Sequence, residues 1–390
     1  KPLWARIHLR SNSTMSAIYF HIPFCKQACH YCNFHFSTSL KYKAEMLEAL
    51  ATEISLRTAE LPTEPLKSIY FGGGTPSMLS PTEVEVLLNS VNAHFSLDPN
   101  VEITLEMNPD DFAPNYLKEI KLAGINRLSL GVQSFFDEEL QLMNRAHTAQ
   151  DAYLIMEDVS CNFENYSIDL IYGMPGSSEE IWKKNIEIAL GFYPPHISSY
   201  VLTIEPKTVL ENQVIKGDVE LLDEEIVLAQ FNVLVEQLTE KGYEHYELSS
   251  FGKTGFHSVN NTAYWQGKPY LGIGPSAHSF YNNQRSWNVS NNKKYLDGMG
   301  QGTLSIEREI LTLIDQYNEF IMIGLRTSKG VSISTIHTRF GDRFAALFEQ
   351  HIEKHLSLQN LFWDGDTVKV TQKARFLVDG IASDLFLLNL

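Results

Sequence analysis

The chain has 390 residues, with 31 Lys and Arg against 47 Asp and Glu, so its formal net charge is -16. At about 150 residues per domain, this length predicts two domains, or one large α/β barrel with an appendage. The acidic balance argues against nucleic acid as a partner, because no basic stripe is present to release phosphate counterions. No run of 18 apolar residues occurs, so we expect no membrane-spanning helix, although contact with a membrane surface stays open.

Residues 1–14 precede Met15, which is typical of a natural start, and they lack the long apolar stretch of a secretory signal. We therefore expect them to be a leader left over from expression. Three of the four cysteines lie within residues 25–32, unlike the spread-out pairs of a secreted protein. This usage predicts a metal site in a cytoplasmic protein. Cys161 stands apart, and we expect it to be a small buried side chain.

Short apolar runs alternate with helical segments between Ser16 and Glu205, which predicts an α/β fold with a parallel sheet, open or curled into a barrel. The predicted strands are Ala17–His21, Ser68–Phe71, Glu102–Glu106, Arg127–Leu130, Ser167–Ile171 and Ile197–Leu202.

The intervening segments carry helix signals of two kinds. Apolar residues recur every four positions over residues 42–54, which places them on one helix face. Ser80 with Glu83, and Ser177 with Glu180, have the spacing of a capping box and predict helix starts.

The rest of the chain predicts a helix over Asp223–Gly242 and a strand over Tyr243–Leu248. The character changes near Asn291, so we divide the chain into a core of residues 15–290 and a smaller, mainly helical domain of residues 291–390 with a β wing. The elements expected in the second part are helices over Glu307–Ile323 and Ser334–Leu356, a hairpin turning at Asp364-Gly365, and a last helix from Thr371.

The strongest chemical signal is the spacing Cys-x3-Cys-x2-Cys formed by Cys25, Cys29 and Cys32. Thiolates at this spacing can reach three corners of one iron–sulfur cube from a single loop. The alternative is a tetrahedral zinc site completed by His30 or His35.

Polar residues follow the predicted strands at the same end as the cysteines. A Gly-Gly-Gly-Thr-Pro segment at residues 72–76 follows the second strand, Glu106 closes the third, Gln133 lies past the fourth, and Asp169 lies in the fifth. In parallel α/β folds, ligands bind outside the carboxyl ends of the strands. These residues therefore predict one binding site together with the thiols.

With Tyr31 at the aromatic place, the cysteine motif reads Cys-x3-Cys-x-aromatic-Cys and resembles that of the radical S-adenosylmethionine (SAM) superfamily. This resemblance implies a partial (β/α)6 barrel and a 4Fe-4S cluster held by Cys25, Cys29 and Cys32. It also implies that SAM chelates the open iron and that an electron donor reduces the cluster.

Within that superfamily, residues 19–25, 71–76, 131–134, 169–175 and 324–326 resemble the group that contains oxygen-independent coproporphyrinogen III oxidase and the heme chaperone HemW. The resemblance implies a SAM pocket lined by Tyr19, Tyr31, Gly73, Gly74, Thr75, Glu106, Gln133, Arg145 and Asp169. In that pocket Arg145 would pair with the methionyl carboxylate.

Two features favour the chaperone over the oxidase within this group. The oxidase has a fourth cysteine in a Cys-x-Cys pattern where this chain has Phe34, and it has a longer segment before its cluster loop. The resemblance thus implies a protein that binds heme as cargo and delivers it to acceptor proteins, some of them membrane-associated. Oxidative decarboxylation of coproporphyrinogen is the alternative, and we assign no catalytic residue.

The chaperone group has a His-Asn-x-x-Tyr-Trp motif linked to heme binding, and here Asn260 stands at the histidine place. We expect His257, with Tyr264 and Trp265, as candidate heme contacts. The segment at residues 272–277 matches the dinucleotide pattern Gly-x-Gly-x-x-Ala, but no second βαβ unit follows it, so we expect no nucleotide there.

Overall fold

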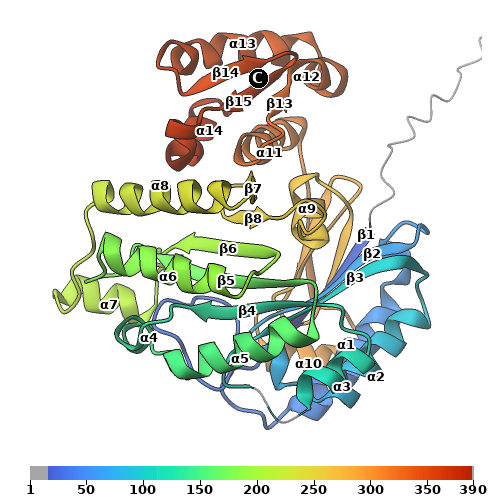
Figure 1. Cartoon of the computed structure of the whole chain (residues 1–390). Coiled ribbons are helices and arrows are strands. Elements are labelled where there is room, and N and C mark those ends of the chain that lie inside the picture. The colour runs from blue at the N-terminus through green and yellow to red at the C-terminus, as the bar shows by residue number, and fades with distance from the viewer. Residues whose placement is uncertain (1–15, 112, 114, 389–390) are drawn as a thin grey trace, which may run out of the picture.

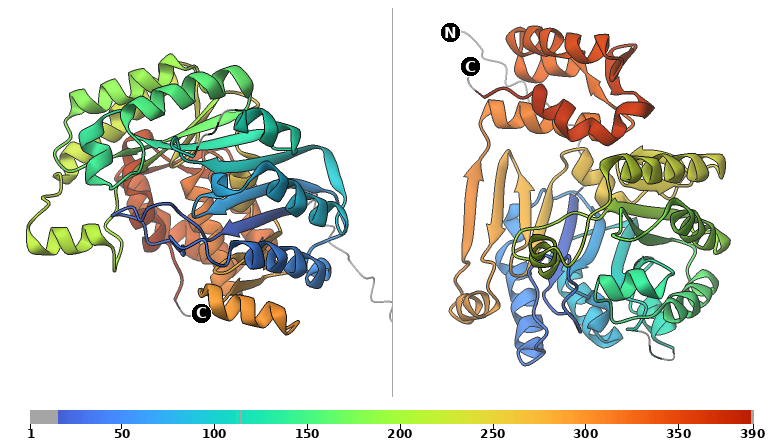
Figure 2. Two further views of the ribbon diagram at one scale, coloured as in Figure 1. Left: turned by 90° about the horizontal axis from the view of Figure 1, so that it is seen from below. Right: turned by 90° about the vertical axis from the view of Figure 1, so that its left-hand side faces the viewer.

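A large twelve-stranded sheet dominates the computed structural model, which describes residues 16–111, 113 and 115–388 (Figure 1). The predicted leader lies outside these residues. No helix in the described part of the chain is long and apolar enough to cross a membrane. A small lobe lies on the large one, beside β7, β8 and α9 (Figures 1 and 2).

The six central strands of the sheet are parallel and neighbour one another in chain order, as in a partial (β/α)6 barrel. Most of their residues are buried, so the strands read as largely apolar runs, although the third strand is half-buried or exposed over its first five residues. Five predicted strands are confirmed as parts of β1 (Ser16–Ile22), β2 (Leu66–Gly73), β3 (Leu97–Met107), β4 (Arg127–Gln133) and β5 (Tyr166–Tyr172). The sixth is confirmed as β6 (His196–Val201), which ends one residue before the predicted Leu202.

Helices cover the outer side of the curved sheet (Figure 2). The capping box at Ser80 is confirmed, but the cap of α6 is Ser178 rather than Ser177. The reason is that α6 begins at Glu179, so the amide of Ile181 donates to the Ser178 hydroxyl. The helices and turns of the large lobe are α1 (Lys43–Leu56), η1 (Thr58–Glu60), η2 (Pro76–Met78), α2 (Pro81–Asn92), α3 (Tyr116–Leu122), α4 (Asp137–Leu142), α5 (Ala149–Asn162), α6 (Glu179–Gly191), α7 (Val209–Lys216), α8 (Glu224–Glu240), α9 (Val259–Trp265) and α10 (Asn292–Gly300).

Cys161 is exposed, so the expectation of a buried side chain is wrong. It lies near the end of α5, where Val159 faces the core and a residue two positions later faces away from it.

Further strands extend the sheet at both edges. Beyond β1 it continues through β9 (Tyr270–Ile273), β10 (His278–Tyr281), β11 (Gln284–Asn288) and β12 (Ile306–Ile310). Beyond β6 it continues through β8 (Ser250–Gly252) and β7 (Glu244–Glu247), which confirms the strand predicted there. The helix predicted from Glu307 is wrong over its first residues, because β12 pairs with β11 and the helix starts only after the Thr312 cap.

The small lobe has a hydrophobic core of its own, built around residues such as Tyr317, Ile321 and Phe348. The predicted hairpin at Asp364-Gly365 is confirmed. The predicted helix over Ser334–Leu356 is two helices, broken at Gly341 with φ +92°. The elements of this lobe are α11 (Leu313–Arg326), β13 (Val331–Ser332), α12 (Ile333–Phe340), α13 (Asp342–Ser357), β14 (Leu361–Asp364), β15 (Thr367–Val370), η3 (Gln372–Leu377) and α14 (Val378–Asp384).

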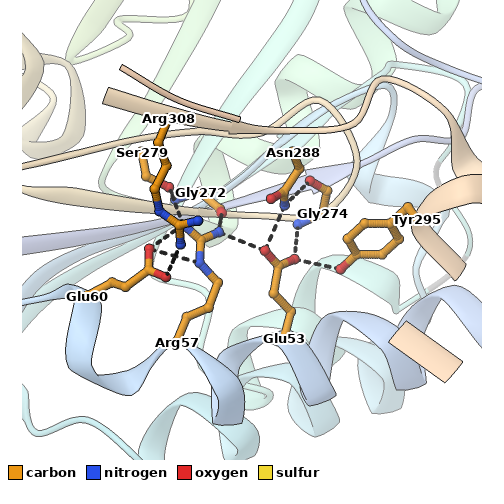
Figure 3. A network of polar contacts seen from close by, with 9 residues as sticks. All are labelled: Glu53, Arg57, Glu60, Gly272, Gly274, Ser279, Asn288, Tyr295 and Arg308. Carbon is orange, nitrogen blue, oxygen red and sulfur yellow. Dashed lines mark hydrogen bonds and ion pairs between the residues drawn. The ribbon is translucent and has the colours of Figure 1, made fainter. Parts of the chain in front are cut away.

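A buried polar network joins α1 to β9, to β10 and to the turn between them (Figure 3). Arg57 donates to the carbonyl of Gly272 at 2.8 Å, and Glu53 accepts from the amide of Gly274 at 2.8 Å. Glu53 and Arg57 also pair with each other at 2.7 Å with almost no exposure. The Gly-x-Gly-x-x-Ala segment is therefore held by side chains of the protein itself.

Candidate functional site

Two adjoining cavities lie at the carboxyl ends of the parallel strands. The smaller has a volume of about 460 Å³ and contains the three thiols, whereas the larger has about 1070 Å³ and extends toward β9–β11 and α11. The residues that line both cavities are Asn33, Phe34, Phe36, Gly73 and Glu106.

Cys25, Cys29 and Cys32 line the smaller cavity from the loop between β1 and α1. The amide of Thr75 donates to the carbonyl of Phe24 at 2.7 Å, which fixes this loop against the end of β2. Burial raises the pKa of the Cys25 thiol to about 11, and the neighbouring thiols add to this. A metal that binds here therefore has to displace protons, as expected for thiolate ligands.

The structure places the two histidines of the zinc alternative elsewhere. His30 Nδ1 lies 3.1 Å from the carbonyl of Leu142, and His35 Nε2 lies 2.7 Å from Asn292 Oδ1. No histidine of the described residues lines the cavity with the thiols. The thiols thus lack the imidazole that a Cys3His zinc site needs.

Arg145, which lies between α4 and α5, brings a positive charge to the thiols. Its Nη1 lies 3.5 Å from Cys29 Sγ and 3.4 Å from the Tyr31 hydroxyl, while Nη2 donates to Asn108 at 2.7 Å and to the Gly131 carbonyl at 2.9 Å. No carboxylate of the described residues forms an ion pair with Arg145, whose titratable hydrogen-bond partners are the Tyr31 hydroxyl and the Cys29 sulfur. A half-buried cation of this kind fits an anionic cluster or a carboxylate ligand.

The backbone at the end of β4 is strained where it meets the cavity. Gln133 has φ +66°, which is uncommon for a residue other than glycine, and the pairing of β4 with β5 is irregular there. A Cβ at Gly131 would lie 3.0 Å from Gln133 Nε2 and 3.3 Å from Arg145. A Cβ at Gly74 would lie 2.5 Å from the Phe24 carbonyl oxygen, so both glycines permit a close approach.

Two carboxyl groups face the cavities with altered acidity. Burial raises the pKa of Glu106 to about 7, and the Asp169 charge adds to this effect, although the Tyr70 hydroxyl donates to Glu106 at 2.9 Å. Burial also raises the pKa of Asp169 to about 6, partly offset by Arg127. Both groups can therefore change protonation near neutral pH, as is typical of binding and catalytic sites.

Sequence reasoning missed several residues that line the smaller cavity, among them Asn108, Ser129 and Tyr200. A signal for two of them was present in the alternation of side chains along a strand. Ser129 lies four residues before Gln133 on the same face of β4, and Asn108 lies two residues past Glu106.

Aromatic side chains and several charged groups line the larger cavity. Tyr264 of α9 and Tyr270 of β9 meet edge to face with ring centroids 4.5 Å apart. Tyr19 also lines this cavity, and burial raises its pKa well above the usual value. Arg285 of β11 pairs with Glu319 of α11 at 2.5 Å, so the small lobe forms part of the wall.

The structure brings only part of the expected heme contacts together. Tyr264 lines the larger cavity, whereas the Trp265 ring lies under the Arg326 guanidinium at 5.5 Å. The His257 ring stacks on Tyr246 at 4.1 Å, and its Nε2 lies 3.2 Å from Glu244. His257 is not among the described residues that line either cavity.

Asn260, which stands where the resembled motif has histidine, is buried in α9 and lines neither cavity. Its side-chain oxygen accepts from the Ser68 hydroxyl at 3.4 Å, and its backbone N–H donates to the Glu102 carboxylate at 3.3 Å. His278 is the histidine near this region that lines the larger cavity.

Comparison with known proteins supports this organisation. The sequence pattern of the radical SAM superfamily matches residues 19–188, and that of the HemN C-terminal domain matches residues 311–377. The solved structure of coproporphyrinogen III oxidase (HemN) from Escherichia coli has the same fold, with a TM-score of 0.83, 23% identity, and coverage of 96% of this chain and 90% of that one.

Relatives of similar length show the family. The heme chaperone HemW of Bacillus subtilis is 33% identical over 93% of this chain and 97% of its own. The mouse mitochondrial radical S-adenosyl methionine domain-containing protein 1 is 34% identical over 83% of this chain and 75% of its own. The chain therefore belongs to the radical SAM superfamily and, within it, to the family that includes the HemW proteins.

Proposed function

We propose that this chain is a radical-SAM-type heme chaperone, which binds a 4Fe-4S cluster, SAM and heme and passes the heme to acceptor proteins. The observation that supports this most is the junction of two unlike cavities. One is small and contains three thiols and Arg145, and the other is large and aromatic. The HemW name of relatives at about a third identity agrees with it.

In this arrangement, different residues would hold the cluster and SAM. Cys25, Cys29 and Cys32 would hold the cluster, which when bound supplies the electron that cleaves SAM. Arg145 would hold the methionyl carboxylate in a charge-assisted hydrogen bond.

The polar side chains around Arg145 would orient the rest of the SAM molecule. Gln133 and Asp169 would contact the ribose hydroxyls or the amine. Gly73, Gly74 and Thr75 would let the ligand approach the backbone at the end of β2. Tyr31 and Asn108, which flank Arg145, would keep its guanidinium in place.

Oxygen-independent coproporphyrinogen oxidation is the second candidate, because the fold of the oxidase covers nearly the whole chain. Phe34 argues against it. This side chain is 68% exposed and lines both cavities, at the place where the oxidase has its fourth cysteine. An apolar ring there cannot replace a thiol in proton or metal chemistry.

We further propose that the protein works in the cytoplasm, receives electrons from a donor that reduces the cluster, and serves acceptors that include membrane-associated heme proteins. The net charge of -16 supports protein rather than nucleic-acid partners.

The test is an anaerobic assay of reconstituted protein with SAM, a reductant and coproporphyrinogen III, followed by a heme titration of the same preparation. We expect a brown protein whose absorption bleaches under dithionite, no protoporphyrinogen, and saturable heme binding. Turnover to protoporphyrinogen would establish the oxidase instead. A colourless protein with stoichiometric zinc would overturn the cluster assignment.

A further inference from the structure

Three imidazoles line the larger cavity, and they differ in how their nitrogens are engaged. His21 Nε2 lies 2.8 Å from the His35 carbonyl and its Nδ1 lies 3.4 Å from the Tyr19 hydroxyl. His35 Nε2 is bound to Asn292. Neither ring nitrogen of His278 has a hydrogen-bond partner among the residues that the structure describes.

His278 is also held in a defined place. It is the first residue of β10, and its ring stacks on Trp287 with centroids 5.9 Å apart. The next residue, Ser279, accepts from Arg57 at 3.0 Å and from the amide of Gly272 at 2.9 Å. The buried network in Figure 3 therefore fixes the backbone that carries this imidazole.

The face of the β10–β11 hairpin that carries His278 also carries an apolar group and a cationic group. His278 and Phe280 lie on one face of β10, because side chains alternate along a strand. Their cross-strand partners are Trp287 and Arg285. An imidazole, a phenyl ring and a guanidinium thus form one surface, and His278, Phe280 and Arg285 all line the cavity.

We propose that His278 is the axial ligand to the iron of a heme in the larger cavity and that Arg285 binds one of the heme propionates. This assignment rests on the proposed function, because it names the two residues that would hold the heme. Burial and the nearby Arg285 charge lower the pKa of His278, so its imidazole is neutral at pH 7 and has a free lone pair.

The chemistry of each group fits this ligand. Histidine is the commonest protein ligand of heme iron, and arginine recognises carboxylates with two parallel hydrogen bonds. The volume of about 1070 Å³ and the aromatic walls of Tyr264 and Tyr270 suit a flat, apolar macrocycle. Asn260, by contrast, lies outside the cavity and offers only an amide.

The experiment is a titration of the full-length reconstituted protein with ferric heme, followed by absorption and electron paramagnetic resonance spectra. We expect His278→Ala to weaken heme binding at least tenfold and to remove the spectrum of a histidine-ligated heme. His278→Met should bind heme with a changed spectrum, because the iron gains a thioether ligand. His94→Ala, an exposed histidine at the end of α2, is the matched control and should behave as the wild type.

Metal-free protoporphyrin IX separates ligation from the shape of the cavity. His278→Ala should bind it within twofold of the wild type, whereas Arg285→Met should bind both porphyrins at least fivefold more weakly. An unchanged heme spectrum in His278→Ala, or its loss in His257→Ala, would overturn the assignment of the ligand. If the wild type binds neither heme nor the porphyrin, the proposed function itself fails.

Discussion

Glu53→Gln tests whether the buried network of Figure 3 maintains the wall of the larger cavity. The Glu53 carboxylate is fully buried and accepts four hydrogen bonds. One oxygen accepts from Arg57 and from Asn288, both at 2.7 Å. The other accepts from the amide of Gly274 at 2.8 Å and from the Tyr295 hydroxyl at 2.6 Å. Glutamine keeps the shape but turns one of these acceptors into a donor.

The expected loss in the free energy of unfolding follows from the buried donors that lose their acceptor. Whichever way the amide of the glutamine turns, its NH₂ group faces donors, and each buried donor left without an acceptor costs about 1–3 kcal/mol. Arg57 also loses its buried counter-charge, and breaking a buried pair costs about 3–5 kcal/mol. We therefore expect Glu53→Gln to lower the free energy of unfolding by about 3–5 kcal/mol.

Glu60→Gln is the matched control, because Glu60 also pairs with Arg57, at 2.8 Å, but its side chain is 30% exposed. We expect this change to cost less than Glu53→Gln, because the partly exposed side chain can reorient and a glutamine oxygen at this position can still accept from Arg57. Urea unfolding followed by circular dichroism compares the two variants, and amide exchange at Gly274 reports the local effect. If Glu53→Gln costs no more than Glu60→Gln, the network does not stabilise the wall as we argue.

Three further predictions concern the Cys25 thiol, Glu106 where the two cavities meet, and Gly274. Cys25→Ala should lose the brown absorption of a reconstituted cluster, whereas exposed Cys161→Ala should keep it. Because burial raises the pKa of Glu106 from 4.5 to about 7, the stability of the wild type should fall as the pH rises from about 4.5 to 7. Glu106→Gln should remove about 1–3 kcal/mol of that pH dependence in urea midpoints measured at pH 5 and pH 8. Gly274→Ala should lower the melting temperature by several degrees, because its φ is +106° and its Cβ would lie 2.6 Å from the His21 carbonyl oxygen.

The parallel half of the sheet and its ligand end could be predicted because both follow from local rules. A strand buried on both faces must be a continuous apolar run, and polar residues at its carboxyl end then stand out. Glu106, Gln133 and Asp169 were found in this way, and the structure gathers them around the cavity with the thiols. The cysteine spacing also predicted that the loop after the first strand lies at this end of the sheet.

The strand β12 and the orientation of two histidines could not be predicted, because both depend on contacts between distant segments. Ile306 and Ile310 are four residues apart, which places them on one face of a helix but equally on one face of a strand, so the sequence could not identify β12. His257 and His278 are both loop-adjacent histidines in the sequence. Only the pairing of β10 with β11 and the stacking of His257 on Tyr246 decide which of them faces the cavity.

The two cavities share part of their lining, but most residues that line the larger cavity come from later parts of the chain. The thiols, Arg145 and Asp169 all lie within residues 19–188, the part that matches the radical SAM superfamily as a whole. His278, Arg285 and Glu319 lie beyond it, on the added strands β10 and β11 and on α11 of the small lobe. A ligand carboxylate at Arg285 would compete with Glu319, because both use the same guanidinium. A ligand that binds Arg285 would therefore act on a contact between the lobes, so under the proposed function heme binding and the placement of the small lobe would be coupled through Arg285 and Glu319.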